Sequence, residues 1–415
     1  MLDSALQFLA AHPLILATVK ILIVFSVLSG LLAYIVYLER KVLAFMQARL
    51  GPMRVGPWGI LQAIADPLKL ILKEDIVPSG ADKILFLIAP VISVAAAFTV
   101  FAAIPFGDKD IVIHGVNLGL PLISNTNIGI LFILAVSSLG IYGIILGGWA
   151  SNSHYPLLGA LRSAAQLVSY EVAGGMAIVG ILLISHSMSL VDIVEKQQTM
   201  GVWNFFLQPV GFFIYLVAAI AETNRSPFDL PEAESELTAG FHTEYSGFRF
   251  SLFFMAEYTS MVLVSCIAVT LFWGGWLRPF QGVASLEFLE FTPVAVFLVG
   301  AGAIFLGARN NPVTGEKLVL FAIAAGCVLL AGALAYPMVT SAIQGIFWFS
   351  AKVFVFLYAF IWYRGTFPRY RYDQLMNLGW RVMIPLGLAN VIVTAAISYI
   401  LQPHPAAPAL GMLGR

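Results

Sequence analysis

The stretch ILATVKILIVFSVLSGLLAYIVY at residues 15–37 decides the fold class, because Lys20 is its only charged residue. An apolar run of about 18 residues or more can cross a bilayer as a helix. Similar runs follow near 84–106, 127–149, 164–186, 205–222, 251–274, 291–308, 317–336, 340–362 and 382–401. In lipid every backbone polar group needs an internal partner, so each run is predicted to be helical. The sequence therefore predicts an all-α polytopic membrane bundle of about ten transmembrane helices.

The composition also indicates a chain that lies in lipid, and it argues against a metal or redox cofactor on this chain. Of 415 residues, 60% are hydrophobic and 11% charged, whereas soluble domains carry about 25% charged residues. The formal net charge is zero, so no basic excess favours a nucleic-acid partner. Two cysteines are too few for an iron–sulfur cluster, which takes about four thiolates, and the histidines show no metal-ligand spacing. We expect no metal site here and any redox cofactor on another chain.

The distribution of basic residues predicts the orientation. Sixteen of the 22 Lys and Arg residues fall in the odd-numbered loops: Arg40, Lys41, Arg49, Arg54, Lys69, Lys73, Lys83, Arg162, Arg225, Arg249, Arg309, Lys317, Arg364, Arg369, Arg371 and Arg381. The positive-inside rule places these loops in the cytoplasm and both termini on the outer, periplasmic side. Residues 1–402 are predicted to form one transmembrane domain, and 403–415 a C-terminal tail.

Three glutamates fall within or at the ends of apolar spans: Glu171 in QLVSYEVAGG, Glu222 in VAAIAETNR and Glu257 in FFMAEYTS. A carboxylate near the bilayer centre costs roughly 3 kcal/mol on the gentler insertion scale. Desolvation favours the neutral form, so such a group can load and release a proton. The alternative is a structural ion pair with a buried base such as Lys20 or Lys352, or an interfacial position for Glu222. Bases are few in the spans, so at least one acid is expected without an ion-pair partner.

The segment 56–75 of the first cytoplasmic loop has helical amphipathicity. One face carries Gln62, Asp66, Lys69 and Lys73, and the other Leu61, Ile64, Leu68, Ile71 and Leu72. The pattern predicts an interfacial helix whose basic residues lie among the lipid headgroups. Pro67 either kinks this helix or marks its start. The helix walls a side entrance for a lipid-soluble molecule, or it only anchors the loop.

Two further loops carry concentrated charge. The loop 222–250 holds six acids against Arg225 and Arg249. Asp229 and Glu232 have the spacing of a capping box, and the remaining acids are expected to titrate as a coupled group against a partner subunit. The last loop, WYRGTFPRYRYDQLMNLGW, interleaves arginines with tyrosines. It is expected to bind anionic headgroups, a partner protein, or the acids at 229–236.

Four strings are long and specific: ERKVLAFMQARLGP at 39–52, GWASNS followed by GALRSAAQLVSYEV, AETNRSPFDLPEAESELTAGFHTEYSG, and KVFVFLYAFIWYRGTFPRYRYDQLM at 352–376. With the spans between them they cover most of 15–275 and 345–400. On these strings the chain resembles the quinone-channel membrane subunit of respiratory complex I, known as the H subunit in bacteria and as subunit 1 among the mitochondrially encoded NADH dehydrogenase subunits.

The resemblance implies a membrane subunit of a proton-translocating NADH:quinone oxidoreductase in an energy-transducing inner membrane, the plasma membrane of a bacterium. Quinone is the substrate, and FMN and iron–sulfur clusters lie on peripheral-arm partners, with antiporter-like subunits alongside in the membrane. Its buried acidic chain matches Glu171, Glu222 and Glu257, and its acidic coupling loop matches Asp229, Glu232, Glu234 and Glu236. The quinone channel is predicted at Glu39, Arg40, Gln47, Arg49, Trp58, Gln62, Asp66 and Arg225.

Two features depart from the family pattern. The family usually has eight membrane helices, and the excess here is predicted as an inserted helix pair at 288–340. His154 and Pro156 stand where Lys and Ala are expected. Two other functions remain open: the equivalent subunit of a membrane-bound hydrogenase, which needs no quinone, and an independent ion transporter. The intact PFDLPEAESEL loop favours complex I over the hydrogenase, and the lack of paired repeats disfavours a transporter.

Overall fold

A computed structural model of the chain describes residues 7–8, 10–107, 112–113, 116–119, 123–230, 239–279, 284–310 and 314–401. Within these ranges nine helices are long and apolar enough to cross a membrane. The shorter apolar helix Pro209–Glu222 lies where a further span was predicted. The all-α polytopic prediction is therefore confirmed. The predicted tail 403–415 lies outside the described residues.

The helices that carry the spans are α2 (Pro13–Met46), α4 (Lys83–Thr99), α5 (Gly129–Ala150), α6 (His154–Ser185), α9 (Pro209–Glu222), α11 (Gly247–Phe272), α12 (Thr292–Asn310), α13 (Thr314–Leu334), α14 (Pro337–Thr366) and α16 (Ile384–Leu401). Shorter elements connect them: η1 (Pro57–Gly59), α3 (Gln62–Leu72), η2 (Val100–Ala103), α7 (Leu190–Met200), α8 (Asn204–Leu207), η3 (Gly240–His242), η4 (Ala284–Phe291), α15 (Tyr372–Asn377) and the π-helical turn η5 (Leu378–Met383). A two-residue antiparallel ladder joins β1 (Val112–Ile113) and β2 (Val116–Asn117).

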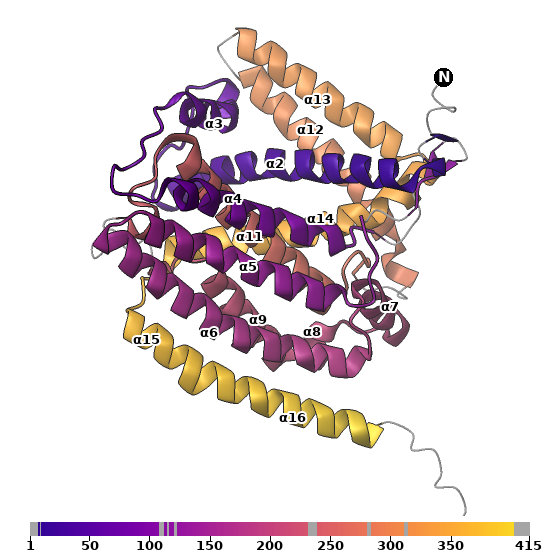
Figure 1. Ribbon diagram of the computed structural model, residues 1–415. Helices are drawn as coiled ribbons and strands as arrows, with labels where there is room; N and C mark the ends of the chain where they lie inside the picture. The colour runs from indigo at the N-terminus through magenta and orange to yellow at the C-terminus, as the bar shows by residue number, and fades with distance from the viewer. Residues whose placement is uncertain are drawn as a thin grey trace, which may run out of the picture.

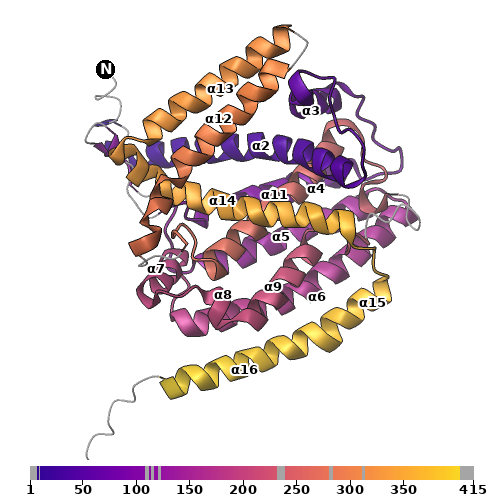
Figure 2. The same cartoon turned by 180° about the vertical axis from the view of Figure 1, so that it is seen from behind.

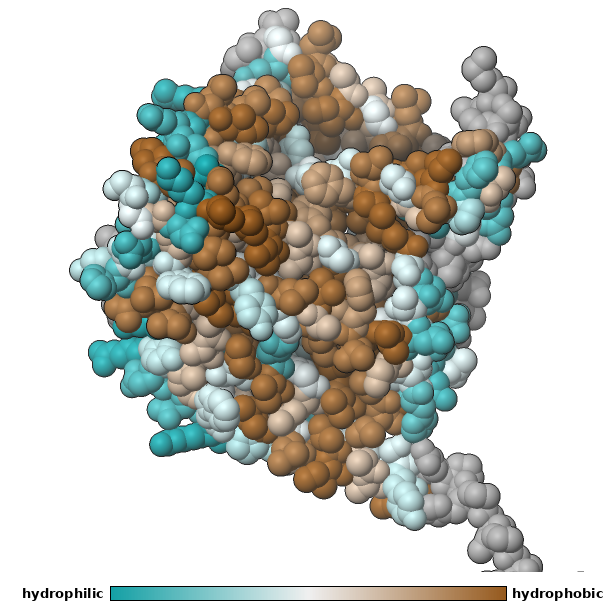
Figure 3. All heavy atoms as spheres, viewed as in Figure 1, coloured by the Kyte–Doolittle hydropathy of each residue, from teal (hydrophilic) through white to brown (hydrophobic). Residues whose placement is uncertain are grey.

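The long helices lie side by side with their axes close to parallel (Figure 1 and Figure 2). The start of α2 and the end of α16 lie at the same end of the bundle, while α3 and α15 lie at the opposite end. Hydrophobic residues cover the middle of the face seen in Figure 3, and hydrophilic residues gather at its two ends. This distribution is expected of helices that cross a bilayer.

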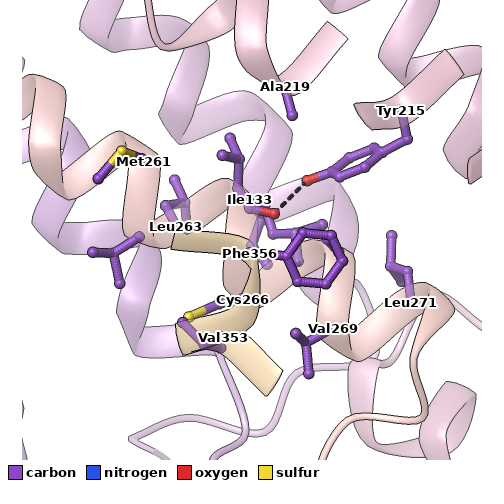
Figure 4. Packing of buried hydrophobic residues seen from close by; sticks show 14 of the residues in the cluster. Ile133, Tyr215, Ala219, Met261, Leu263, Cys266, Val269, Leu271, Val353 and Phe356 are labelled. Carbon is purple, nitrogen blue, oxygen red and sulfur yellow. Dashed lines mark hydrogen bonds between the residues drawn. The ribbon is translucent and has the colours of Figure 1, made fainter. Parts of the chain in front are cut away.

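Helix α11 forms the centre of the bundle and is the most buried of the described spans. It packs against α2, α4, α9 and α14. In Figure 4, Cys266 of α11 lies beside Val353 of α14, and the Tyr215 hydroxyl of α9 donates to the Val264 carbonyl at 2.9 Å. A tyrosine hydroxyl buried among apolar side chains needs such a partner. Glu257 therefore lies on the helix with the most extensive packing among the described spans.

The predicted span at 205–222 is broken into α8 and α9. Pro209 begins α9, where its missing N–H and fixed φ are tolerated. The Gln208 side chain at the break donates to Thr394 Oγ1 at 2.6 Å and accepts from Asn390 Nδ2 at 2.9 Å. Both partners belong to α16, so these bonds tie the last helix to the bundle.

Helices α12 and α13, in the region predicted as an inserted pair, pack on each other and lie beside α2 in both cartoon views (Figure 1 and Figure 2). Gly307 of α12 lies against the indole of Trp58, because a Cβ built on this glycine would come within 2.4 Å of Trp58 Cζ2. Helix α13 also contacts η1. The helix pair therefore supports the beginning of the interfacial segment.

The interfacial helix is shorter than predicted. Helix α3 covers Gln62–Leu72, and the residues before it form η1 and a turn. Pro67 lies inside α3, so the alternative that it marks the helix start is wrong. Ile64, Leu68 and Ile71 are exposed, as an apolar face turned to lipid requires.

Candidate functional site

The three predicted membrane glutamates come from three helices and line one internal cavity. Glu171 lies on α6, Glu222 ends α9 and Glu257 lies on α11. The cavity and its mouth have an empty volume of about 820 Å³. Hydroxyl and amide side chains complete its polar lining: Ser93, Ser137, Ser138, Thr223, Asn224 and Ser260. An internal polar cavity can hold ionisable groups that would be costly against acyl chains.

One of the three carboxylates has a basic partner. Glu257 Oε1 lies 2.6 Å from Arg225 Nε, whereas no ion pair to Glu171 or Glu222 occurs among the described residues. Lys352 is not the partner that the alternative suggested. Its ammonium donates to the carbonyls of Trp273, Gly275 and Leu277 at 2.6, 3.0 and 2.7 Å. The buried base therefore comes from a loop and not from a span.

A hydrogen-bonded turn after α9 brings Arg225 into the bundle. Gln166 of α6 donates from Nε2 to the carbonyls of Ala221 and Phe228, each at 2.9 Å. Asn224 adopts a left-handed φ of 49°, and its amide donates to Ser163 at 3.3 Å. These bonds hold both sides of the turn against α6, so the Arg225 side chain is only 6% exposed.

Arg225 connects two acids in a group that we call the Arg225 cluster: the largely buried Glu39, Arg225, Glu257 and Tyr258, and the more exposed Arg364. Arg225 Nη1 lies 3.2 Å from Glu39 Oε1, and Arg364 forms a further ion pair with Glu39. The Tyr258 hydroxyl donates to Glu39 Oε2 at 2.8 Å, and the Arg225 guanidinium lies 4.1 Å from the Tyr258 ring centroid. Two cations thus balance two carboxylates.

The electrostatics of the cluster keep Arg225 charged. Burial lowers the pKa of its guanidinium, but the Glu257 carboxylate, Tyr258 and the Glu39 carboxylate raise it more, and the net pKa lies well above its ordinary value. A guanidinium that stays charged and has two acidic neighbours can strengthen its interaction with one carboxylate while it weakens the interaction with the other. The cluster therefore links α2, α11 and α14 by charge.

The acidic loop contacts the last basic loop. Asp229 Oδ2 lies 2.9 Å from Arg369 Nη2, and Phe228 stacks on Tyr370 with ring centroids 5.5 Å apart. Burial raises the pKa of Asp229 despite the lowering effect of Arg369. This contact agrees with the docking of acids from 229–236 onto the last loop. The other predicted members, Glu232, Glu234 and Glu236, lie outside the described residues.

The predicted channel residues divide into separate groups. Glu39 and Arg225 belong to the Arg225 cluster. Arg40 and Asp66 form an ion pair at 2.7 Å, and Gln62 Nε2 donates to Asp66 at 2.6 Å. Asp66 and Gln62 on the polar face of α3 are thus turned to α2, whereas the basic residues Lys69 and Lys73 of the same face are exposed. The Arg40–Asp66 ion pair therefore connects α3 to α2 next to Glu39.

The remaining channel candidates lie farther from the cluster. Trp58 has a left-handed φ of 54°, and its carbonyl accepts from the Tyr37 hydroxyl at 2.8 Å. Its side chain packs against Gly307. Arg49 Nε donates to Gln47 Oε1 at 2.7 Å, and both residues are exposed. The structure does not bring Gln47 and Arg49 into the cluster.

Sequence reasoning missed three site residues. Arg364 was treated only as a loop charge, and Tyr258 was not among the predicted site residues. Ser138, which bonds Glu171, was not considered, although the Ser-Ser pair at 137–138 interrupts an apolar span. A polar pair in a membrane helix is the signal that marks such a residue.

Comparison with known proteins identifies the family. A family model described as NADH dehydrogenase matches residues 19–395. The second of two NADH-quinone oxidoreductase H subunits of Solibacter usitatus (strain Ellin6076) is 51% identical over 395 residues, covering 94% of this chain and 98% of the relative. The first H subunit of Koribacter versatilis (strain Ellin345) is 52% identical over 401 residues, covering 92% and 91%. The H subunit of Thermomicrobium roseum (strain ATCC 27502 / DSM 5159 / P-2) is 43% identical over 383 residues, covering 90% and 94%. The chain therefore belongs to the family of NADH-quinone oxidoreductase H subunits.

Proposed function

We propose that the chain is the membrane subunit of a proton-translocating NADH:quinone oxidoreductase in which buried glutamates pass protons when quinone is reduced. The observation that carries the proposal is that Glu171, Glu222 and Glu257, from three helices, line one cavity together with hydroxyl and amide side chains. Carboxyls in one cavity interact, so protonation of one changes the proton affinity of the others. Water held by the polar groups of this cavity can carry protons between them.

The Arg225 cluster is the proposed link to quinone chemistry. Arg225 lies between Glu39 and Glu257, and Arg364 reaches Glu39 from α14. Negative charge that develops on a quinone near this cluster would attract the guanidinium groups. A weaker interaction between Arg225 and Glu257 favours proton uptake by Glu257. That proton is then available to Glu222 and Glu171 in the same cavity.

Quinone access is proposed along α2 and α3. The exposed apolar residues of α3 suit a lipid-facing wall, and the Arg40–Asp66 pair fixes this wall to α2. Trp58 and Gln62 lie at the start of the same segment. Quinone is the substrate, and the chain itself holds no cofactor in this proposal.

Partners and location complete the proposal. FMN and iron–sulfur clusters belong to peripheral-arm subunits, and antiporter-like subunits continue the proton path in the membrane. The end of the bundle with α3 and α15 faces the cytoplasm, and both termini face the periplasm, in agreement with the basic loops. The names of the relatives favour this function over the hydrogenase and transporter alternatives.

Glu257→Gln in the assembled complex tests the proposal. The neutral amide keeps the side-chain size but cannot exchange a proton, so coupled quinone reduction and proton pumping should fall at least tenfold. NADH oxidation by ferricyanide, which needs only the peripheral arm, should remain. Glu195→Gln, at an exposed position of α7, is the matched control and should behave like the wild type. Near-normal pumping by Glu257→Gln would reject the proposed role.

A further inference from the structure

The Ser138 hydroxyl lies between two oxygen acceptors. It forms a hydrogen bond with Glu171 Oε1 across the interface of α5 and α6, and it also donates to the Leu134 carbonyl one turn earlier at 2.8 Å. A hydroxyl has one hydrogen to donate and lone pairs that can accept. It can therefore donate to only one of these two oxygens at a time.

The other hydroxyls of this wall have different partners. Ser137 donates to the Leu134 carbonyl at 3.0 Å, and Ser93 donates to the Gly140 carbonyl at 3.4 Å. Both residues line the same cavity as Glu171 but form no bond with its carboxyl among the described contacts. Ser138 is thus distinguished from its neighbours by geometry and not by residue type.

The two arrangements of Ser138 match the two protonation states of Glu171. When the carboxyl is ionised it only accepts, so the hydroxyl hydrogen points to Oε1. When the carboxyl is protonated it donates to the hydroxyl oxygen, and the hydroxyl hydrogen turns to the Leu134 carbonyl. In each state the Ser138 hydroxyl and Glu171 Oε1 stay paired, which matters because an unpaired polar group is costly in a low-dielectric site.

Charged groups near Glu171 come from two of the helices that face the cavity. Glu222 of α9 and Glu257 of α11 share the lining, whereas α4 and α5 contribute hydroxyls. Elements packed elsewhere on α6 carry exposed charges that lie outside the lining: Arg381 on η5, Asp373 on α15, and Asp192, Glu195 and Lys196 on α7. His242 on η3 is buried and also lies outside the lining. Among the described contacts, Ser138 is therefore the neutral side chain that is hydrogen-bonded to Glu171 and can respond to its proton.

We propose that Ser138 is a positioning residue that reorients its hydroxyl with the protonation of Glu171 and so keeps both states of this carboxyl accessible. The inference rests on the proposed function, because it assigns Glu171 a proton that comes and goes. No bond other than hydrogen bonds is formed or broken, and the proton itself stays with the carboxyl or leaves through the cavity.

Infrared difference spectroscopy of the assembled complex tests this inference. The carboxylic C=O band of Glu171, assigned by its loss in Glu171→Gln, reports the protonated fraction at each pH. Ser138→Ala removes the hydrogen bond of both states, and the charge-assisted bond of the ionised state is stronger than the neutral bond of the protonated state by a factor of about ten. The ratio of protonated to ionised Glu171 at a fixed pH should therefore rise about tenfold.

Conservative variants separate this role from a structural one. Ser138→Thr keeps the hydroxyl and should restore the wild-type ratio, while Ser138→Cys, a weaker donor, should give an intermediate ratio. Ser137→Ala, the neighbouring serine, should leave the ratio unchanged. A ratio in Ser138→Ala within twofold of the wild type would overturn the inference. The infrared band reports only the protonation of Glu171. An unchanged ratio in Ser138→Ala would therefore reject this inference, whereas near-normal pumping by Glu257→Gln would reject the proposed function.

Discussion

Arg225 Nε lies 2.6 Å from Glu257 Oε1, and the same guanidinium reaches Glu39 Oε1 at 3.2 Å. One buried cation thus serves two carboxylates from different helices. Removing one partner of a buried ion pair costs about 3–5 kcal/mol, because the remaining charge stays desolvated. The stability of this region should therefore depend on charge balance more than on any single contact.

Arg225→Gln should destabilise the bundle strongly, because Glu257 then loses its cation and Glu39 keeps only Arg364. The thermal unfolding midpoint of the complex in detergent should fall by several degrees. The double variant Arg225→Gln with Glu257→Gln removes the charge and its partner together and should recover part of this loss. A double variant less stable than Arg225→Gln would contradict the charge-balance argument.

Lys352→Met should destabilise the end of α11. The ammonium satisfies three backbone carbonyls after the last turn of α11 and lies 4.4 Å from the Trp203 ring centroid. A cation at a helix C-terminus is also favourable to the helix dipole. Each buried acceptor left unpaired costs about 1–3 kcal/mol. Unfolding measurements should show a clear loss for Lys352→Met and almost none for Lys196→Met, whose side chain is exposed on α7.

Gly307→Val should displace Trp58 and loosen the interfacial segment, because any Cβ at this position meets the indole. Hydrogen exchange of residues 57–72 in the assembled complex should become faster. Gly302→Val is the matched control on the same helix, since no atom lies within 4 Å of its ideal Cβ. Equal exchange in the two variants would mean that α12 does not support the start of α3.

His242 should make stability fall on acidification. Its side chain lies among Phe241, Phe250 and Phe254, and burial lowers its pKa from 6.5 to about 4. The folded protein therefore holds the neutral ring, and the unfolded chain binds a proton first. This contribution is complete above pH 6.5 and is lost progressively down to about pH 4; it amounts to about 3 kcal/mol.

The matching measurement compares unfolding midpoints at pH 7 and pH 5 for the wild type and His242→Gln. The amide cannot titrate, so the variant should lose less stability between the two pH values than the wild type. An equal loss in both proteins would show that other groups control the acid sensitivity.

Much of the fold follows from the sequence alone. Long apolar runs must become helices in lipid, since no water is present to satisfy the backbone. The predicted spans therefore correspond to the observed helices, including α12 and α13. Boundaries were less secure: Pro209 divides one predicted span, and α3 ends at Leu72 where the pattern continued to 75.

The candidate site was only partly predictable. Glu171, Glu222 and Glu257 stand out because charge is rare in apolar runs, and that rarity is visible without coordinates. The cavity that these three glutamates share cannot be predicted from the sequence, because it depends on which faces of α6, α9 and α11 meet. The pairing of Glu257 with Arg225 was equally hidden, since it depends on the turn that folds a loop arginine back into the bundle.

The sequence by itself determined that the chain crosses a membrane, about how many times, and which residues carry costly charge there. Only the tertiary structure decided which of these charges meet, since helix rotation and loop packing are set by contacts between distant segments. An apolar run shows by itself that the segment lies in lipid, because this depends only on the residues of the run. Ion pairs such as Glu39–Arg364, between residues on α2 and α14, arise only when the helices are assembled.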